Sequence, residues 1–222
     1  MLVPKNNFIL VWIWGQNIRD NGIHALSAAL KTNSTLTTII ALKNSIESTG
    51  AQALSAVLKT NTTLTILNLM HTATGSDGAR SPSEALVVNS TLTTLNLNTN
   101  LVGDDGVQAL AETLKTNSTL PNMDFTQKYV GEDRAEALSA VLKINSTLTI
   151  LICGARALSE ALKINSTLTT LDVWGNNIED DDAETLAEAL RTNLNLTNLE
   201  LGLNNIGFDG TQALSEARKT SR

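Results

Sequence analysis

The sequence predicts an α/β solenoid, a curved stack of eight repeated units that each contribute one short strand and one helix. The chain repeats with a period of 28 residues, and a fixed period of this length indicates a solenoid or another repeat array. The string Asn-Ser-Thr-Leu begins at Asn33, Asn89, Asn117, Asn145 and Asn165, with variants at Asn61 and Asn193. Within a unit, apolar residues first alternate as in a strand and then recur as on a helix. Leu, Thr and Asn account for 35, 29 and 23 of the 222 residues, a bias that repetition explains.

The units fill the chain, which we expect to be one domain, 1–222. Seven units have 28 residues and one has 20. They occupy 5–32, 33–60, 61–88, 89–116, 117–144, 145–164 (the short unit), 165–192 and 193–220. Only Met1 to Pro4 and Ser221 to Arg222 fall outside the units, which leaves no room for a second domain or a linker.

The unit 165–192 shows both elements. Leu171 and Val173 alternate as in a strand with one buried face. A turn follows at 175–177, and carboxylates near 181–184 fit the first turn of a helix, where the helix dipole favours negative charge. The apolar helix positions, spaced by three and four, are Ala183, Leu186, Ala189 and Leu190. Each unit has two apolar faces that it cannot bury alone, so neighbouring units must stack.

Stacking also predicts a curved shape. Paired strands lie about 4.8 Å apart, whereas packed helices need about 8–10 Å. The strands are therefore expected to form a parallel sheet on the concave side of a horseshoe, with the helices on the convex side.

The chain resembles leucine-rich repeat proteins, because the pattern L-x-x-L-x-L-x-x-N-x-[IV] is present. It is matched by Leu92, Leu95, Leu97, Asn100 and Val102, by Leu168, Leu171, Val173, Asn176 and Ile178, and by Leu196, Leu199, Leu201, Asn204 and Ile206. The unit length and strings such as Gly-Ala-Gln-Ala-Leu-Ser (50–55) are most similar to the ribonuclease-inhibitor-like subclass found in NOD-like receptors. The resemblance implies a right-handed α/β horseshoe.

The Asn at unit position 12 is expected to bond the backbone of the turn and of neighbouring coils. It is retained at Asn44, Asn100, Asn176 and Asn204. Gln16, Thr72 and Lys128 replace it in other units, so we expect loose turns in the third and fifth units.

Two further departures concern a proline and a deletion. Pro82 lies where most units have a helix Leu, and a Pro inside a helix costs about 3 kcal/mol. We therefore predict a short helix over 82–88, with Ser81 as N-cap and Glu84 in its first turn. The unit 145–164 lacks positions 10–17, which indicates either a pinched coil or a decayed or misassembled gene.

Composition excludes several functional classes. A net charge of -6 argues against the basic surface that binding to nucleic acid or an anionic membrane requires. The apolar run 8–14 is too short to cross a bilayer and lacks the flanks of a signal peptide. A single Cys excludes an internal disulfide framework. We expect a cytoplasmic protein that binds neither nucleic acid nor membrane.

The side chains at unit positions 6, 8 and 10 are expected to point into the concave face and to bind a protein partner. The N-terminal strip is apolar and consists of Leu10, Trp12, Trp14, Ile40, Leu42, Ile66 and Met70. The C-terminal strip is more acidic and consists of Asp172, Trp174, Asn198 and Glu200, so it would select basic groups. Tryptophan is a frequent anchor in interfaces. The alternative interpretation is that Trp14 and Trp174, which share one unit position, cover the strand end as part of the repeat.

The sequence shows no catalytic, cofactor or metal site. His24 and His71 lack a nucleophile or metal-ligand partner, and Cys153 falls on a buried strand position. The acidic run 179–182 fits a helix start better than a calcium loop. Glycosylation sequons begin at Asn33, Asn61, Asn89, Asn117, Asn145, Asn165 and Asn195, and a repeated turn residue explains all but the last.

Three hypotheses follow. The first is a noncatalytic protein-binding module, the recognition region of an intracellular protein similar to NOD-like receptors. The second is a GTPase-activating protein resembling the Ran GTPase activators, with Arg19 in a strand-to-helix loop as the group that stabilises phosphoryl charge. The third is a repeat fragment without a function of its own, because no polar capping unit precedes Phe8 and the sixth unit is shortened, although Arg218 gives the last helix a polar position. Exposed solenoid ends also allow end-to-end self-association.

Overall fold

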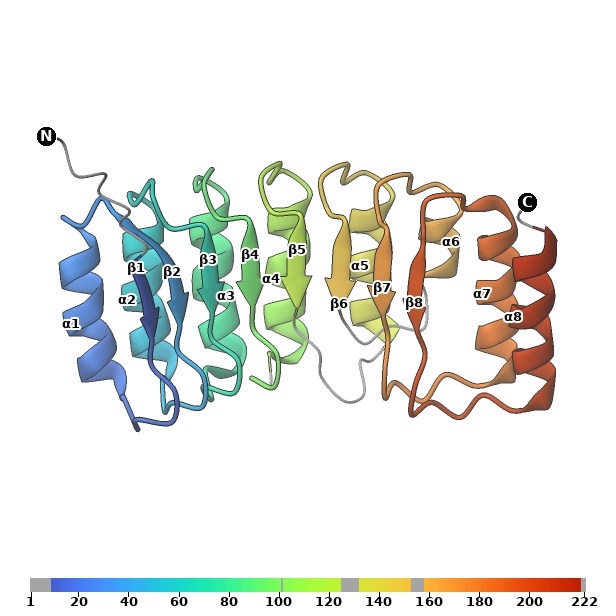
Figure 1. Cartoon of the computed structure of the whole chain (residues 1–222), viewed down its shortest axis with the longest axis horizontal. Coiled ribbons are helices and arrows are strands. Elements are labelled where there is room, and N and C mark those ends of the chain that lie inside the picture. Colours follow the sequence, from blue (N-terminus) through green and yellow to red (C-terminus); the bar gives the residue numbers. More distant parts are fainter. Residues whose placement is uncertain (1–8, 101, 125–131, 153–157, 221–222) are drawn as a thin grey trace, which may run out of the picture.

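The structure is a computed structural model that describes residues 9–100, 102–124, 132–152 and 158–220. Strands and helices alternate along the chain (Figure 1). The strands are β1 (Ile9–Trp12), β2 (Leu36–Ile40), β3 (Ile66–Asn68), β4 (Thr94–Asn96), β5 (Asn122–Asp124), β6 (Ile150–Ile152), β7 (Thr170–Asp172) and β8 (Asn198–Glu200). The helices are α1 (Asp20–Leu30), α2 (Ser48–Leu58), α3 (Gly75–Leu86), α4 (Gly103–Leu114), α5 (Glu132–Leu142), α6 (Ser159–Leu162), α7 (Asp180–Thr192) and α8 (Phe208–Thr220).

All described strands belong to one parallel sheet, in the order β1 to β8. Figure 1 shows that the helices form a second layer that covers one face of the sheet. The register repeats from strand to strand, so that Leu67 pairs with Leu95 and Leu95 with Met123. The predicted fold class, an α/β leucine-rich-repeat solenoid with the sheet on its concave side, is confirmed.

The core lies between the two layers and is built from columns of equivalent residues. Unit position 7 supplies Ile39, Leu67, Leu95, Met123, Leu151 and Leu171, whose exposed fractions are 0 or 1%. Strand residues on either side of each of these point to the opposite face of the sheet, because side chains alternate along a strand. The face without helices is therefore left to display side chains.

The repeated Asn at unit position 1 connects neighbouring coils. Asn89 is buried, and its Nδ2 donates to the carbonyls of Leu58 at 2.8 Å and Asn61 at 3.3 Å. Its Oδ1 accepts from the N–H groups of Thr91 at 3.1 Å and Leu92 at 2.8 Å. A side chain whose Nδ2 is buried and bonded has no free nitrogen for a glycan, which supports the structural interpretation of the sequons.

The Asn at position 12 has the predicted role in the turns. Asn44 Nδ2 donates to the Ile13 carbonyl at 2.7 Å, and its Oδ1 accepts from the Ile18 N–H at 3.1 Å. In the third unit Thr72 takes over, since its hydroxyl donates to the Leu69 carbonyl at 2.7 Å and the residue is fully buried. The loose turn predicted there is not seen; Lys128, the replacement in the fifth unit, lies outside the described residues.

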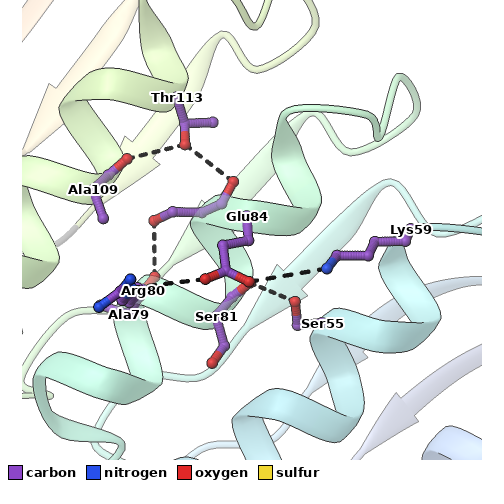
Figure 2. Close-up of polar contacts among 9 residues, drawn as sticks. Ser55, Lys59, Ala79, Arg80, Ser81, Glu84, Ala109 and Thr113 are labelled. Carbon is purple, nitrogen blue, oxygen red and sulfur yellow. Dashed lines mark hydrogen bonds and ion pairs between the residues drawn. The ribbon is translucent and has the colours of Figure 1, made fainter.

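The short helix predicted over 82–88 is wrong, because α3 runs from Gly75 to Leu86 with Pro82 inside it. Hydroxyl groups of the two adjacent helices donate to backbone carbonyls of α3 (Figure 2). Ser55 Oγ, from α2, donates to the Ser81 carbonyl, and Thr113 Oγ1, from α4, donates to the Ser83 carbonyl at 3.0 Å. These bonds attach α3 to the helices on both sides of it, and α3 continues through Pro82 to Leu86.

The short unit does not interrupt the array. Ile150 on β6 pairs with Thr170 on β7, although the two residues are 20 apart in sequence instead of 28. Asn165 Nδ2 still reaches the Leu142 carbonyl at 2.7 Å. The helix of this unit is reduced to the four residues of α6, and residues 153–157, including Cys153, lie outside the described part of the chain. The described residues of the short unit thus continue the sheet, and whether the deletion is a pinched coil or the mark of a decayed or misassembled gene stays open.

Candidate protein-binding face

The concave face is formed by the strand side chains that point away from the helices. In β3, β4, β5 and β7 the middle residue is buried and its two neighbours are half-buried. The side chains predicted for this face occupy unit positions 6, 8 and 10, and all those that the structure describes are half-buried or exposed. Position 10 of the fifth unit and the side chain of Ile152 lie outside the described part of the chain. The sheet is thus a rigid platform whose exposed chemistry differs from end to end.

The N-terminal end of this face, on β1 to β3 and the turns after them, is rich in apolar side chains, and those of the first unit are exposed. Trp12 and Trp14 are 63% and 56% exposed, and Leu10 is exposed as well. Trp12 lies beside Ile40 in the sheet register. The site residues predicted here lie together on neighbouring strands, and we call them the apolar end: Trp12, Trp14, Ile40, Leu42 and Met70.

Trp14 has a cation beside its ring. Lys43 Nζ lies 5.8 Å from the centroid of the Trp14 ring, within the range of a cation–π interaction. Lys43 lies in the turn after β2 with a φ of 51°, and the equivalent turn residues His71 and Thr99 also have positive φ. The interaction restrains the indole but leaves most of its surface exposed to solvent.

The C-terminal end of the face is acidic. Asp172 on β7 pairs with Glu200 on β8, so two carboxylates lie on adjacent strands. Asp172 is half-buried and its Oδ1 accepts from the Trp174 N–H at 2.9 Å, whereas Glu200 is exposed. We call Asp172, Trp174 and Glu200 the acidic end. Four strand spacings from β3 to β7 separate it from the apolar end by about 20 Å.

Trp174 and Trp14 share a unit position but have different surroundings. A Cβ on Gly202, the equivalent residue of the next unit, would lie 2.5 Å from Cδ1 and 2.7 Å from Nε1 of Trp174. The indole of Trp174 therefore lies against Gly202, which is itself still exposed. The residue next to Trp14 at this position is Leu42, which is half-buried. The alternative interpretation of the two tryptophans as strand covers fits Trp174 better than Trp14.

Sequence reasoning missed a polar cluster in the middle of the face. Asn96 Nδ2 and Asn98 Nδ2 donate to Asp124 Oδ2 at 2.9 and 3.3 Å. These residues occupy positions 8 and 10 of the fourth unit and position 8 of the fifth, so the same rule that selected the two ends would have found them. The concave face thus changes from apolar to amide-rich to acidic along the sheet.

Carboxylates at the opposite, helix-starting edge have a structural role. Asp20 Oδ1, at the start of α1, accepts from the Glu47 N–H at 2.8 Å, and its Oδ2 accepts from the Thr49 hydroxyl. Burial raises the pKa of Asp20, but hydrogen bonds from Thr49, Glu47 and Gly50 outweigh it and hold the pKa below its ordinary value. Asp20 therefore caps the next helix, α2, because helix N-termini carry unbonded N–H groups.

Carboxylates of the acidic run 179–182 also cap helix N-termini. Glu179 is the N-cap of α7, and its N–H donates to Asp182 Oδ2 at 3.0 Å. Asp180 Oδ1 accepts from the N–H groups of Gly207 at 2.7 Å and Gly210 at 3.0 Å, at the start of α8. The predicted helix start is confirmed, and these oxygen atoms are engaged with backbone donors.

The remaining predicted candidates do not form a reaction centre within the described residues. His24 and His71 are both exposed and far apart in the array, and Arg19 is exposed in the loop between β1 and α1. No group of three or more His, Cys, Asp or Glu side chains that could hold a metal ion occurs among the described residues. In the same part of the chain, every helix is too short or too polar to cross a membrane.

Comparison with known proteins identifies the repeats. A family profile described as "Leucine Rich repeat" matches residues 60–81, 88–111, 165–187 and 192–215. Leucine-rich repeats are therefore present in both halves of the chain. No curated protein matches the sequence. The ribonuclease-inhibitor-like subclass stays a prediction.

Two solved structures are similar to the chain at low identity. The tropomodulin C-terminal domain of Caenorhabditis elegans has a TM-score of 0.53 and 13% identity, over 64% of this chain and 92% of that one. A structure of "Leiomodin-1 Actin-Binding Site 2 (ABS2)" has a TM-score of 0.49 and 17% identity, over 65% of this chain and 88% of that one. At such identities the tropomodulin likeness shows a shared fold alone.

Proposed function

We propose that this chain is a noncatalytic protein-binding module that captures a partner on its concave face, with the apolar end as the main anchor. The observation that carries the proposal is the exposure of Trp12 and Trp14 side by side with other apolar residues on a rigid sheet. Large aromatic side chains are mostly buried in folded proteins, and tryptophan dominates the binding energy of many interfaces. An exposed patch of this kind indicates a surface that a partner covers.

The acidic end gives the partner a second requirement. Asp172 and Glu200 would favour a basic group on the partner about 20 Å from its apolar contact. Trp174 adds an indole edge beside these carboxylates. We further propose that the module is the recognition region of an intracellular protein similar to NOD-like receptors, which rests on the resemblance of the repeat units.

The test is affinity capture from cytosolic lysate with identification of the captured proteins by mass spectrometry. We expect Trp12→Ala/Trp14→Ala to weaken binding of the captured partner at least tenfold, or about 1.4 kcal/mol. Adding Trp174→Ala should abolish capture. The matched control is Ile164→Ala, which removes an exposed aliphatic side chain in the turn after α6, away from the concave face.

Circular dichroism and thermal unfolding of every variant separate binding from folding. The truncated side chains are largely exposed, so the variants should unfold within a few degrees of the wild type. The proposal fails if the double Trp variant, folded as the wild type is, captures the same proteins equally well. It also fails if every protein captured by the wild type is captured by this variant as well.

A second candidate function, GTPase activation, is supported by one observation. We propose GTPase activation as the alternative because Arg19 is exposed in a strand-to-helix loop, where a guanidinium can approach a nucleotide bound to a partner. Acceleration of GTP hydrolysis by a Ran-like GTPase, lost in Arg19→Ala and absent from no-protein controls, would support it. A hydrolysis rate that the chain leaves unchanged removes it.

A further inference from the structure

The turns that lead from each helix to the next strand follow one another along one edge of the array, the upper edge in Figure 1. The last residue of a unit and the second residue of the next unit form the tips of these turns. Both positions are exposed in every unit where the structure describes them. Most of the tips are Thr or Ser, so the turn itself requires no apolar side chain. We call the tips at these two unit positions the turn edge.

Four tips of the turn edge are aliphatic instead. Val88, Ile144, Ile164 and Leu194 are 62, 60, 65 and 77% exposed. The fold does not demand them, because the tip equivalent to the first three is a threonine in other units, as at Thr60. They therefore need an explanation outside the packing of the array.

Three of these aliphatic tips lie in successive turns. Asn165 Nδ2 donates to the Asn145 carbonyl at 3.3 Å, and the equivalent bond joins the following turn at 3.0 Å. Ile144 and Ile164 directly precede these two asparagines, and Leu194 belongs to the following turn. The bonds between turns hold the three tips in one row. Single exposed apolar residues are common, but a row of them indicates a surface that is covered.

Basic residues flank these tips. The residue before the last of each unit is Lys115, Lys143, Lys163 or Arg191 in the fourth to seventh units, and all four are exposed. Lys115 and Lys163 each pair at 2.6 Å with the glutamate three residues earlier. Lys143 and Arg191 form no ion pair with any described residue. The turn edge thus combines aliphatic tips with unpaired cations.

The excess negative charge of the chain lies away from this edge. The net charge of -6 gave the expectation that no membrane is bound. However, the acidic run 179–182 lies at the opposite, helix-starting edge, and Asp172 and Glu200 lie on the concave face. A helix of 12 residues such as α4 is about 18 Å long, which exceeds the Debye length of about 8 Å in physiological salt. One helical turn below the tips, the glutamates are paired with lysines. The turn edge is therefore locally basic.

We propose that the turn edge docks on the surface of an anionic membrane. The aliphatic tips insert among the lipid headgroups, and the basic residues beside them contact the anionic groups of the lipids. Such binding combines buried apolar area with attraction to anionic lipid, and it needs no helix that crosses the bilayer.

The occupant is a lipid surface for two reasons. The charge of the turn edge complements anionic headgroups. Its apolar side chains are Val, Ile and Leu among Ser and Thr, whereas the residues that dominate protein interfaces are enriched in Trp and Tyr and depleted in Leu, Val, Ser and Thr. The aromatic anchors of this chain lie on the concave face instead, so the two surfaces serve different ligands.

The test is sedimentation of the full chain with vesicles of phosphatidylcholine alone and with vesicles that also contain about a third phosphatidylserine. The wild type should bind the anionic vesicles and leave the neutral ones unbound. Ile144→Thr/Ile164→Thr introduces the residue that other units have at this tip, so the fold is preserved, and it should weaken binding about tenfold. Lys143→Gln/Arg191→Gln breaks no ion pair among the described residues and should weaken binding and its dependence on salt.

Phe208→Ser is the matched control. It removes an apolar side chain that is 80% exposed at the start of α8, on the opposite edge, where the second and third units have Ser48 and Ser76. It should bind the anionic vesicles as the wild type does. A loss of binding in Phe208→Ser as large as in the Ile144→Thr/Ile164→Thr variant would indicate unspecific adsorption and overturns the proposal.

Three other results overturn it as well. They are a wild type that binds neither kind of vesicle, a wild type that binds both equally, and an Ile144→Thr/Ile164→Thr variant that binds as the wild type does. If the wild type leaves the vesicles unbound but captures from lysate a protein that this variant loses, the turn edge has a protein partner and the membrane assignment is wrong.

Discussion

Replacing Asn89 by alanine should be among the most damaging single substitutions in the chain. Asn89 makes four hydrogen bonds to backbone groups, at 2.8, 3.3, 3.1 and 2.8 Å, and is 5% exposed. Alanine leaves the Leu58 carbonyl and the Leu92 N–H without partners in a buried place, at about 1–3 kcal/mol each. We expect a loss of about 3–5 kcal/mol in the free energy of unfolding, since the two weaker bonds are lost as well.

Two other asparagines serve as comparisons for the expected loss of stability in Asn89→Ala. Asn33 has the same unit position, but among the described residues its side chain bonds through Oδ1 alone, to the N–H groups of Thr35 at 3.0 Å and Leu36 at 2.7 Å. Asn33→Ala should therefore cost about half as much as Asn89→Ala. Asn195 is exposed, and Asn195→Ala should stay within about 0.5 kcal/mol of the wild type.

The assay is equilibrium unfolding in urea, followed by circular dichroism. Midpoints and m-values are compared across the three variants, because a solenoid can unfold in parts and a changed m-value would reveal this. The order Asn89, Asn33, Asn195 is the essential result. If Asn89→Ala costs no more than Asn195→Ala, the bonds between coils do not stabilise the array, and the structural explanation of the repeated Asn is refuted.

Three further predictions concern the coil contacts. Gly50→Ala places a Cβ 2.6 Å from Asp20 Oδ1 and 2.8 Å from Ile46 Cγ2, so it should lower stability by about 1–3 kcal/mol in the same urea assay. The pKa of Asp20 lies below its ordinary value of 3.8, so this carboxylate stabilises the fold above pH 3.8. The advantage of the wild type over Asp20→Asn should therefore shrink as the pH falls below 3.8 through the lowered pKa, which urea midpoints measured against pH will show. Gly202→Ala should displace the indole of Trp174 and shift its fluorescence emission to the red. The measurement uses a background variant, Trp12→Phe/Trp14→Phe, in which Trp174 is the remaining tryptophan.

The fold was predictable because the same pattern of apolar and polar residues recurs in every unit. A leucine at unit position 7 recurs at Leu67, Leu95 and Leu171, and each is buried as the alternation requires. The turn Asn at position 12 was predictable from its chemistry, since an amide offers a donor and an acceptor at once. Such inferences hold because each unit repeats the same local environment.

The errors arose where a residue depends on its neighbours in space. Pro82 was expected to end a helix that was considered alone, but α3 packs between two adjacent helices whose Ser55 and Thr113 hydroxyls bond its carbonyls, and it continues through the proline. Thr72 lacks the reach of Asn, yet it is placed close enough to bond the Leu69 carbonyl directly. Neither contact follows from the period of the repeat, because both depend on the side chains that the adjacent units happen to present.

The same dependence decides which tryptophan serves binding. Trp14 and Trp174 occupy one unit position, so periodicity assigns them one role. Their next units differ: Gly202 leaves room for the Trp174 ring to lie on the backbone, whereas the equivalent residue beside Trp14 is Leu42, which carries a side chain. The Trp14 indole is instead held by Lys43 at 5.8 Å and stays 56% exposed. A partner that covers Trp14 gains more buried surface than one that covers Trp174, so binding should be more sensitive to Trp14→Ala than to Trp174→Ala.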